Sequence, residues 1–310
     1  MLGYIVRRLL LAVPTLVGIT LITFVLLSVV ADDPAMVLVG VKGGEVSIQQ
    51  ARRETGTDKG KAAQYLQFLE ETFTLDFGDS WTKNRPVKDL ILEGLGPSAS
   101  VTVPAFLMAT LLAIALALFC AFYRDSLVDR MTVIAAVAGL SVSSLAYIIF
   151  GQYLIGYRWN LLPVFGYAEG WSGIVFLLMP WMIWIAISVG SDVRFFRTVM
   201  LEEMGKDYVR TAAAKGLGTR RILFRHILKN AMIPIITRVV IAFPFLFVGS
   251  LLLERFFGIP GVGYLSLDAV ANNDYPVIKA IVVYSGILYI LFTLISDLLY
   301  AVVDPRVRLR

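Results

Sequence analysis

Long apolar stretches alternate with polar segments along the chain. The apolar stretches cover residues 9–30, 98–122, 131–155, 174–189, 232–253 and 277–302. About 20 apolar residues in a helix suffice to cross a hydrocarbon core of about 30 Å. The pattern therefore predicts an all-α membrane protein with six transmembrane helices.

The first apolar stretch shares its basic start with cleaved signal peptides. Arg7 and Arg8 precede it. Its core of about 22 residues is longer than the roughly 7 to 15 residues of a signal peptide core. The length favours a membrane helix that stays in the protein.

Residues 31–96 form a polar segment with an excess of acidic residues and a helix-like run, GKAAQYLQFLEETF. Because long loops cross the membrane with little regard to charge, we expect this segment on the outer side. Gly56, Gly60 and Lys61 lack the spacing and the Ser or Thr of a phosphate-binding loop. The expected division is 1–30, cytoplasmic N-terminus and first helix; 31–96, extracytoplasmic loop region; and 97–310, five-helix core.

Composition and charge agree with a membrane protein. The 310 residues are 58% hydrophobic and 16% charged, with a formal net charge of +5. The basic residues lie beside the apolar stretches, which the positive-inside rule explains better than nucleic-acid binding does. About sixteen of them fall at the two termini and in the short loops of one side. We therefore expect both termini and the segment 191–231 to be cytoplasmic.

The sequence contains no catalytic or metal-binding constellation. His226 is the one histidine and Cys120 the one cysteine of the chain. A histidine-based triad, a zinc cluster and an internal disulfide are therefore excluded within this chain. We expect no enzymatic activity, no bound metal and no cofactor.

The most informative polar segment is 202–234, which separates two apolar stretches. It carries seven basic side chains, so placing it in lipid would cost on the order of 20 kcal/mol. Ala212, Ala213 and Ala214 favour a helix, Gly216 favours its end, and Thr219 is suited to cap a second helix. The pattern predicts a folded loop on the cytoplasmic side that docks against a partner.

This loop resembles the coupling loop of ABC importer permeases, in the form found in the dipeptide, oligopeptide and nickel branch. The resemblance is carried by DYVRTAAAKGL, followed after about ten residues by HILKNAMIP. The general family form has a Glu-Ala-Ala triplet where this chain has Arg210, Thr211 and Ala212. Lys229 stands where many relatives have proline.

Other segments resemble the same branch. Arg7 and Arg8 before the first stretch, Pro14 within it and Asp33-Pro34 after it resemble the first helix of this branch. The segment LDFGDSW at 75–81 is similar to an external motif of the branch. The loop before the last stretch carries a Pro-Gly-x-Gly at Pro260 and ends in Asp274, Tyr275 and Pro276. The resemblance therefore covers nearly the whole chain.

The resemblance implies a type I importer permease fold in a bacterial or archaeal cytoplasmic (inner) membrane, working by alternating access. It implies two ABC ATPase subunits that bind ATP and Mg²⁺, a second, homologous permease with a different sequence, and an extracytoplasmic substrate-binding protein. The residues that match the coupling motif are Asp207, Tyr208, Val209, Arg210, Thr211, Ala212, Ala213, Ala214, Lys215, Gly216 and Leu217.

Two charged residues fall within apolar stretches. Arg238 and Asp297 lie at a similar depth, very roughly 8 Å from the cytoplasmic face. One hypothesis is that they form an ion pair at the inner gate. The alternative is that Arg238 reaches the lipid headgroups while Asp297 caps a helix or meets water.

A channel or secondary transporter that works without ATP is the rival class. Its signature would be paired broken helices and several ionisable residues near the membrane midplane, and the sequence has neither clearly. Peptides are the expected substrate because they are the commonest cargo of the branch.

Overall fold

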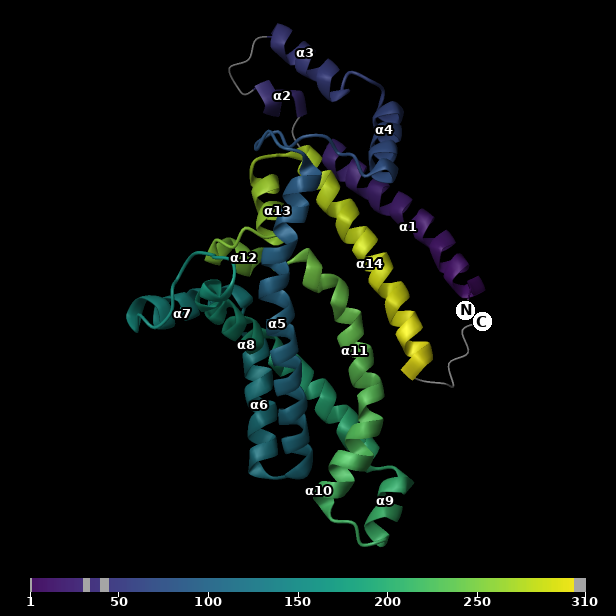
Figure 1. Cartoon of the computed structure of the whole chain (residues 1–310), viewed down its shortest axis with the longest axis vertical. Coiled ribbons are helices and arrows are strands. Elements are labelled where there is room, and N and C mark those ends of the chain that lie inside the picture. The colour runs from purple at the N-terminus through teal and green to yellow at the C-terminus, as the bar shows by residue number, and fades with distance from the viewer. Residues whose placement is uncertain (1, 30–33, 40–44, 304–310) are drawn as a thin grey trace.

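The computed structural model describes residues 2–29, 34–39 and 45–303, which form helices joined by short connections (Figure 1). The helices are α1 (Leu2–Val29), α2 (Pro34–Val39), α3 (Glu45–Thr55), α4 (Lys61–Thr74), α5 (Val87–Phe122), α6 (Leu127–Ser141), α7 (Ser144–Gly151), α8 (Ile174–Met204), α9 (Asp207–Ala214), α10 (Thr219–Ile222), α11 (Leu228–Val248), α12 (Leu251–Phe257), α13 (Val262–Ala271) and α14 (Tyr275–Val303). Short π-helical turns cover Gln152–Arg158 and Leu223–Ile227, and a 3-10 turn covers Trp171–Gly173. The described residues contain one isolated β-bridge and no β-strand, so the predicted all-α fold is confirmed.

Five helical segments of the described chain are long and apolar enough to cross a membrane, and one bent pair would make a sixth span. The five are Leu10–Ser28, Val87–Phe122, Trp171–Met204, Thr219–Val248 and Tyr275–Asp297. Each of the six predicted stretches therefore corresponds to a helix or helix pair.

The third predicted span, 131–155, is not one continuous helix. α6 and the helical segment Ser144–Arg158 meet at an angle of 94°. Val142 is extended, and the Ser143 side chain accepts a hydrogen bond from the Ala146 backbone N–H at the start of α7. The break follows from the sequence Ser-Val-Ser-Ser, because serine at an N-cap starts a new helix. Apolar periodicity alone does not reveal this cap.

Two other predicted boundaries are wrong. The fourth span does not end near residue 189, because α8 continues as one helix to Met204. The fifth span was expected to reach residue 253, but α11 ends at Val248. Gly249 has φ +83°, a left-handed conformation that favours glycine, and the chain then starts the separate helix α12.

The centre of the bundle depends on small residues. Alanines at every fourth position of α5, from Ala105 to Ala121, are buried. At Gly190 of α8, an added Cβ would lie 2.7 Å from the carbonyl oxygen of Ala136 on α6. Side chains this small let neighbouring backbones approach closely, which is how helices associate inside lipid. α5, α6 and α8 therefore pack as one tight unit.

The two ends of the bundle differ in what they carry (Figure 1). α9 and α10 lie at one end, and we call residues 205–222 the elbow and this end the elbow end. α2, α3 and α4 lie at the opposite end, together with α13 near the start of α5 and α14, and we call it the insert end. α7 projects sideways from the bundle.

Candidate functional site

The elbow contains the helix that was predicted from the alanine run. α9 follows Lys206, which is extended, and its first residue, Asp207, places a negative charge at the positive end of the helix dipole. Gly216, with φ +76°, ends the helix by a left-handed turn, as predicted. The predicted cap is wrong: Gly218 precedes α10 and Thr219 is already its first residue, so the Thr219 hydroxyl does not cap it.

One phenol joins α9 to the end of α8. The Tyr208 hydroxyl donates a hydrogen bond to Oε2 of Glu203. Burial and, after it, the bond to Glu203 raise the pKa of Tyr208 to about 12, so the phenol stays protonated and remains a donor at neutral pH.

Apolar burial fixes the underside of the elbow. Ala212 is 5% exposed and belongs to a buried cluster with Phe196 and Met200 of α8. Val209 and Leu217 pack against the same cluster, which also contains Leu223 of the following π-helical turn. The elbow is therefore attached to α8 and to the start of α11 by a continuous packed core.

The outer face of the elbow is polar and accessible. Among the eleven residues that match the coupling motif, Tyr208, Val209, Ala212 and Leu217 point inward, and the rest are exposed. Arg210 lies 3.6 Å from Asp207, but the two side chains are 78% and 95% exposed, so this pair contributes at most about 1 kcal/mol. The structure thus exposes seven of the eleven motif residues, and their contact with an ATPase stays a prediction.

A buried ion pair connects the start of α6, next to the turn that follows α5, to α8. Nε and an Nη of Arg197 donate to the two carboxylate oxygens of Asp129, at 2.6 and 2.7 Å. The Asp129 side chain is 2% exposed, and it also accepts from the Asp125 backbone N–H. Ser126-x-x-Asp129 is a helix-start signature that locates the carboxylate but not its partner on α8.

The predicted inner-gate pair of Arg238 and Asp297 is wrong. Nε of Arg238 lies 3.0 Å from Oδ1 of Asp192, and the guanidinium lies 5.1 Å from the ring centre of Phe195. Asp297 instead forms an ion pair with Arg8, at 2.5 Å. The prediction failed because α8 extends past residue 189, which brings Asp192 into reach, and because α1 packs along α14.

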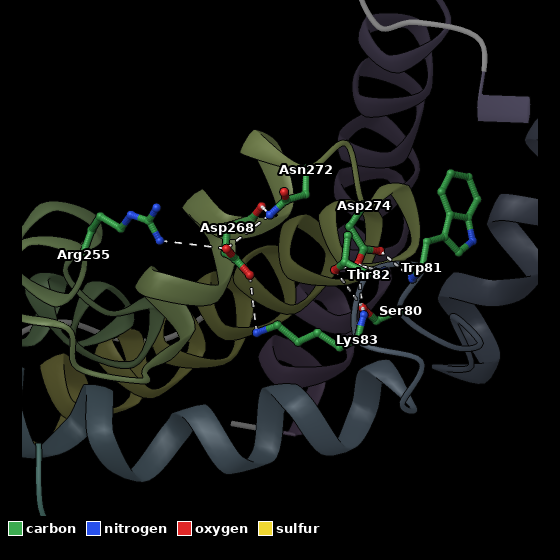
Figure 2. Close-up of polar contacts among 8 residues, drawn as sticks. All are labelled: Ser80, Trp81, Thr82, Lys83, Arg255, Asp268, Asn272 and Asp274. Carbon is green, nitrogen blue, oxygen red and sulfur yellow. Dashed lines mark hydrogen bonds and ion pairs between the residues drawn. The ribbon is translucent and has the colours of Figure 1, made fainter. Parts of the chain in front are cut away.

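At the insert end, Asp274 joins two segments that are far apart in the sequence. Its side chain is buried, and it accepts hydrogen bonds from the Ser80 and Thr82 hydroxyls, at 2.5 and 2.7 Å. The backbone N–H groups of Trp81 and Thr82 also donate to it, each at 3.2 Å (Figure 2). We call these four residues the Asp274 cluster. It connects the LDFGDSW segment to the Asp-Tyr-Pro at the start of α14.

A looser group surrounds Asp268 on α13. Its carboxylate lies 3.5 Å from the ammonium of Lys83 and 3.9 Å from the guanidinium of Arg255, and it accepts from the Asn272 side chain (Figure 2). These side chains are partly exposed, so they contribute much less to stability than the Asp274 cluster does.

A second buried carboxylate explains the glycines between the last two spans. Glu254 on α12 has no exposed surface and accepts from the Ser98 hydroxyl and from the backbone N–H groups of Ser250 and Tyr264, at 2.9 to 3.0 Å. A Cβ at Gly249 or Gly261 would lie within 2.4 Å of this carboxylate. Burial raises the pKa of Glu254, and these hydrogen bonds partly oppose the shift.

No group of three or more His, Cys, Asp or Glu side chains capable of holding a metal ion occurs among the described residues. The buried carboxylates at the insert end are surrounded by hydrogen-bond donors of the protein itself. Their arrangement supports a structural role.

The chain matches two family descriptions. Residues 98–309 match "Binding-protein-dependent transport system inner membrane component", and residues 1–102 match the N-terminal part of such membrane components.

Curated relatives match over nearly their whole length. The glutathione transport system permease protein GsiC of Shigella flexneri serotype 5b is 31% identical over 308 residues, which is 99% of each chain. The probable peptide ABC transporter permease protein y4tP of Sinorhizobium fredii is 32% identical over 311 residues, 98% of this chain and 99% of the relative. GsiC of Escherichia coli K12 is 31% identical, again over 99% of each chain.

Proposed function

The chain belongs to the family of binding-protein-dependent transport system inner membrane components, and from this premise we propose that it imports short peptides by coupling its elbow to ATPase subunits. It is a permease subunit of an ABC importer in the inner membrane, and ATP hydrolysis is carried out by partner subunits. This function excludes the rival class of transporters that work without ATP.

The elbow end faces the cytoplasm in this proposal, and the insert end faces outward. The charge distribution supports this orientation, because most basic residues of the short loops lie at the elbow end and in the terminal segments. The assembly contains two ATPase subunits, a second and different permease, and an extracytoplasmic substrate-binding protein. ATP and Mg²⁺ bind to the ATPases, and this chain supplies no ligand to either.

The observation that carries the proposal is the two-sided construction of α9. Ala212 and Tyr208 attach its inner face to α8, while Asp207, Arg210 and Lys215 present charge outward. When ATP closes the ATPases, a groove that holds the outer face would move α9. The buried inner face would pass that motion to α8 and, through the Asp129–Arg197 pair, to the α5–α6 hairpin. The spans then change between outward-open and inward-open arrangements.

The cargo class follows from the relatives. The printed names of the two kinds of relative refer to glutathione, which is a tripeptide, and to peptides. A short peptide is the chemical class that includes both. Uptake of a labelled panel of di- to pentapeptides and glutathione, in vesicles with the complete assembly, should be ATP-dependent and should favour peptides over free amino acids.

The coupling step can be tested at Gly216, whose surroundings leave open space for a side chain. A valine there must adopt a left-handed backbone at a cost of about 1–2 kcal/mol, which distorts the turn of the elbow. We expect Gly216→Val to reduce ATP-driven peptide uptake about tenfold or more, with normal membrane insertion.

Two matched variants complete this test. Gly216→Asn should keep most of the uptake, because asparagine tolerates the left-handed region. Gly218→Val should do so as well, because Gly218 has φ −64° and open space around it. Full uptake by Gly216→Val would contradict the coupling role of the elbow.

A further inference from the structure

A charged basin of about 820 Å³ opens at the insert end, between α1, α3, α4 and the start of α14. Four basic and two acidic side chains line it, namely Arg52, Arg53, Lys61, Lys279, Asp58 and Glu71. Glu71 forms an ion pair with Lys279. The lining therefore has an excess of positive charge that attracts an anionic partner.

The wall of the basin that α4 forms is held in place before any partner binds. Tyr65 of α4 donates a hydrogen bond to the Val17 carbonyl oxygen of α1 at 3.1 Å. Across the basin, Lys279 of α14 pairs with Glu71 and lies 5.2 Å from the ring centre of Phe68 on α4. α4 is thus attached to two membrane helices, and a preformed surface loses little entropy when a partner binds.

The Asp274 cluster positions an aromatic edge of this basin. The rings of Trp81 and Tyr275 both line it, with their centres 5.4 Å apart. Asp274 accepts from the Trp81 backbone N–H and directly precedes Tyr275, so one buried carboxylate holds both aromatic residues in place. In Figure 2 the Trp81 side chain points away from the cluster.

We infer that this basin is a docking surface for an acidic segment of the extracytoplasmic substrate-binding protein. The inference rests on the proposed function, which places the insert end outside. Tryptophan, tyrosine and arginine are the residues that dominate binding energy at protein interfaces, and all three line the basin. The positive excess selects an acidic partner and steers its approach.

The same features disfavour other occupants. A lipid chain would require a continuous apolar groove, whereas this lining is rich in charged and amide side chains from α3 and α4. A small free anion would need only a cluster of donors, and it would make no use of an aromatic edge held by a buried carboxylate.

The first experiment places a photocrosslinker at Gln49, which lines the basin and is exposed on α3. The complete transporter, with its ATPase subunits, is illuminated in whole cells, and the adduct is mapped by mass spectrometry. We expect an adduct with a substrate-binding protein, at a segment rich in Asp and Glu. An adduct with the second permease or with lipid, or no adduct, would overturn the inference.

Charge reversal then tests the chemistry with the captured binding protein and the purified assembly in nanodiscs. The double variant Arg53→Glu/Lys61→Glu should weaken binding at least about tenfold, and the loss should shrink at high salt. Lys88→Glu makes the same type of change outside the basin, on exposed α5 surface, and should stay within about twofold of wild type. Replacing the mapped acidic residues of the binding protein by lysine should restore binding to the double variant.

The outcomes separate this inference from the proposed function. If the double variant binds like wild type while ATP-driven uptake proceeds, the basin is not the docking surface and the importer function stands. If the wild-type assembly neither retains ATPase subunits nor takes up peptides, the proposed function itself fails.

Discussion

The elbow and the Asp274 cluster place their charged side chains in opposite directions. The elbow is attached by apolar burial and one phenol, and its charged residues point outward into water. In the Asp274 cluster the charge points inward, and every contact joins residues more than 190 positions apart. The elbow therefore exposes its charge to solvent, whereas the cluster uses charge to hold the chain together.

This difference indicates which substitutions of charged residues each end of the bundle tolerates. An outward charge stays solvated whether or not its partner is present, so it contributes to recognition and little to stability. A buried carboxylate that accepts several hydrogen bonds is costly to remove, because its donors lose their partner inside the protein.

The largest expected effect is at Asp274. Replacing Asp274 by alanine leaves the backbone N–H groups of Trp81 and Thr82 without their acceptor. We expect the free energy of unfolding to fall by about 3 kcal/mol, measured by chemical unfolding of the purified assembly in detergent. Asp268→Ala is the matched control. Its cationic partners lie at 3.5 and 3.9 Å and its partner Asn272 is exposed, so the loss should not exceed about 1 kcal/mol. Equal losses would refute the distinction between the two carboxylates.

A smaller effect is expected from the pH dependence of stability at Glu254. Burial raises the pKa of this carboxyl above its usual value of 4.5, so the folded state holds the proton more tightly than the unfolded state does. The stabilising contribution is complete below that value and is lost as the pH rises through the folded-state pKa. The difference in unfolding free energy between wild type and Glu254→Gln should therefore shift against wild type as the pH rises from about 4.5. A difference that is constant with pH, or a shift in favour of wild type, would contradict this account.

The smallest effect on stability is expected at Arg210. Arg210→Ala should change the free energy of unfolding by less than about 0.5 kcal/mol, because Arg210 and its ion-pair partner Asp207 are both exposed. The same variant should weaken retention of the ATPase subunits during purification. If Arg210→Ala retained the ATPase subunits as wild type does but lost much of its unfolding free energy, Arg210 would stabilise the fold and would not serve recognition. That result would contradict this account.

Local signals in the sequence were sufficient to predict much of the elbow. The alanine run and Gly216 lie close together in the sequence, and α9 forms and ends where they indicate. The cap at Thr219 was misplaced by one residue. The apolar stretches also located the spans, because each helix must satisfy its own backbone in lipid.

Contacts between distant segments could not be predicted in this way. Asp274 and Glu254 are each paired with hydroxyls more than 150 positions away, and no spacing rule links such residues. The wrong pairing of Arg238 with Asp297 has the same origin. The position of a residue along one helix can be read from the sequence, but its partner depends on which helices are neighbours.

The central claim is that ATPase subunits contact the outer face of α9. Two neighbouring alanines test it directly, because Ala213 is exposed and Ala212 is 5% exposed. Cysteine is introduced at each position in a Cys120→Ala background of the complete importing assembly, and a thiol crosslinker of fixed length is added. The account predicts an ATPase adduct from Ala213→Cys and almost none from Ala212→Cys. The absence of an ATPase adduct from Ala213→Cys, or equal adducts from both positions, would contradict it.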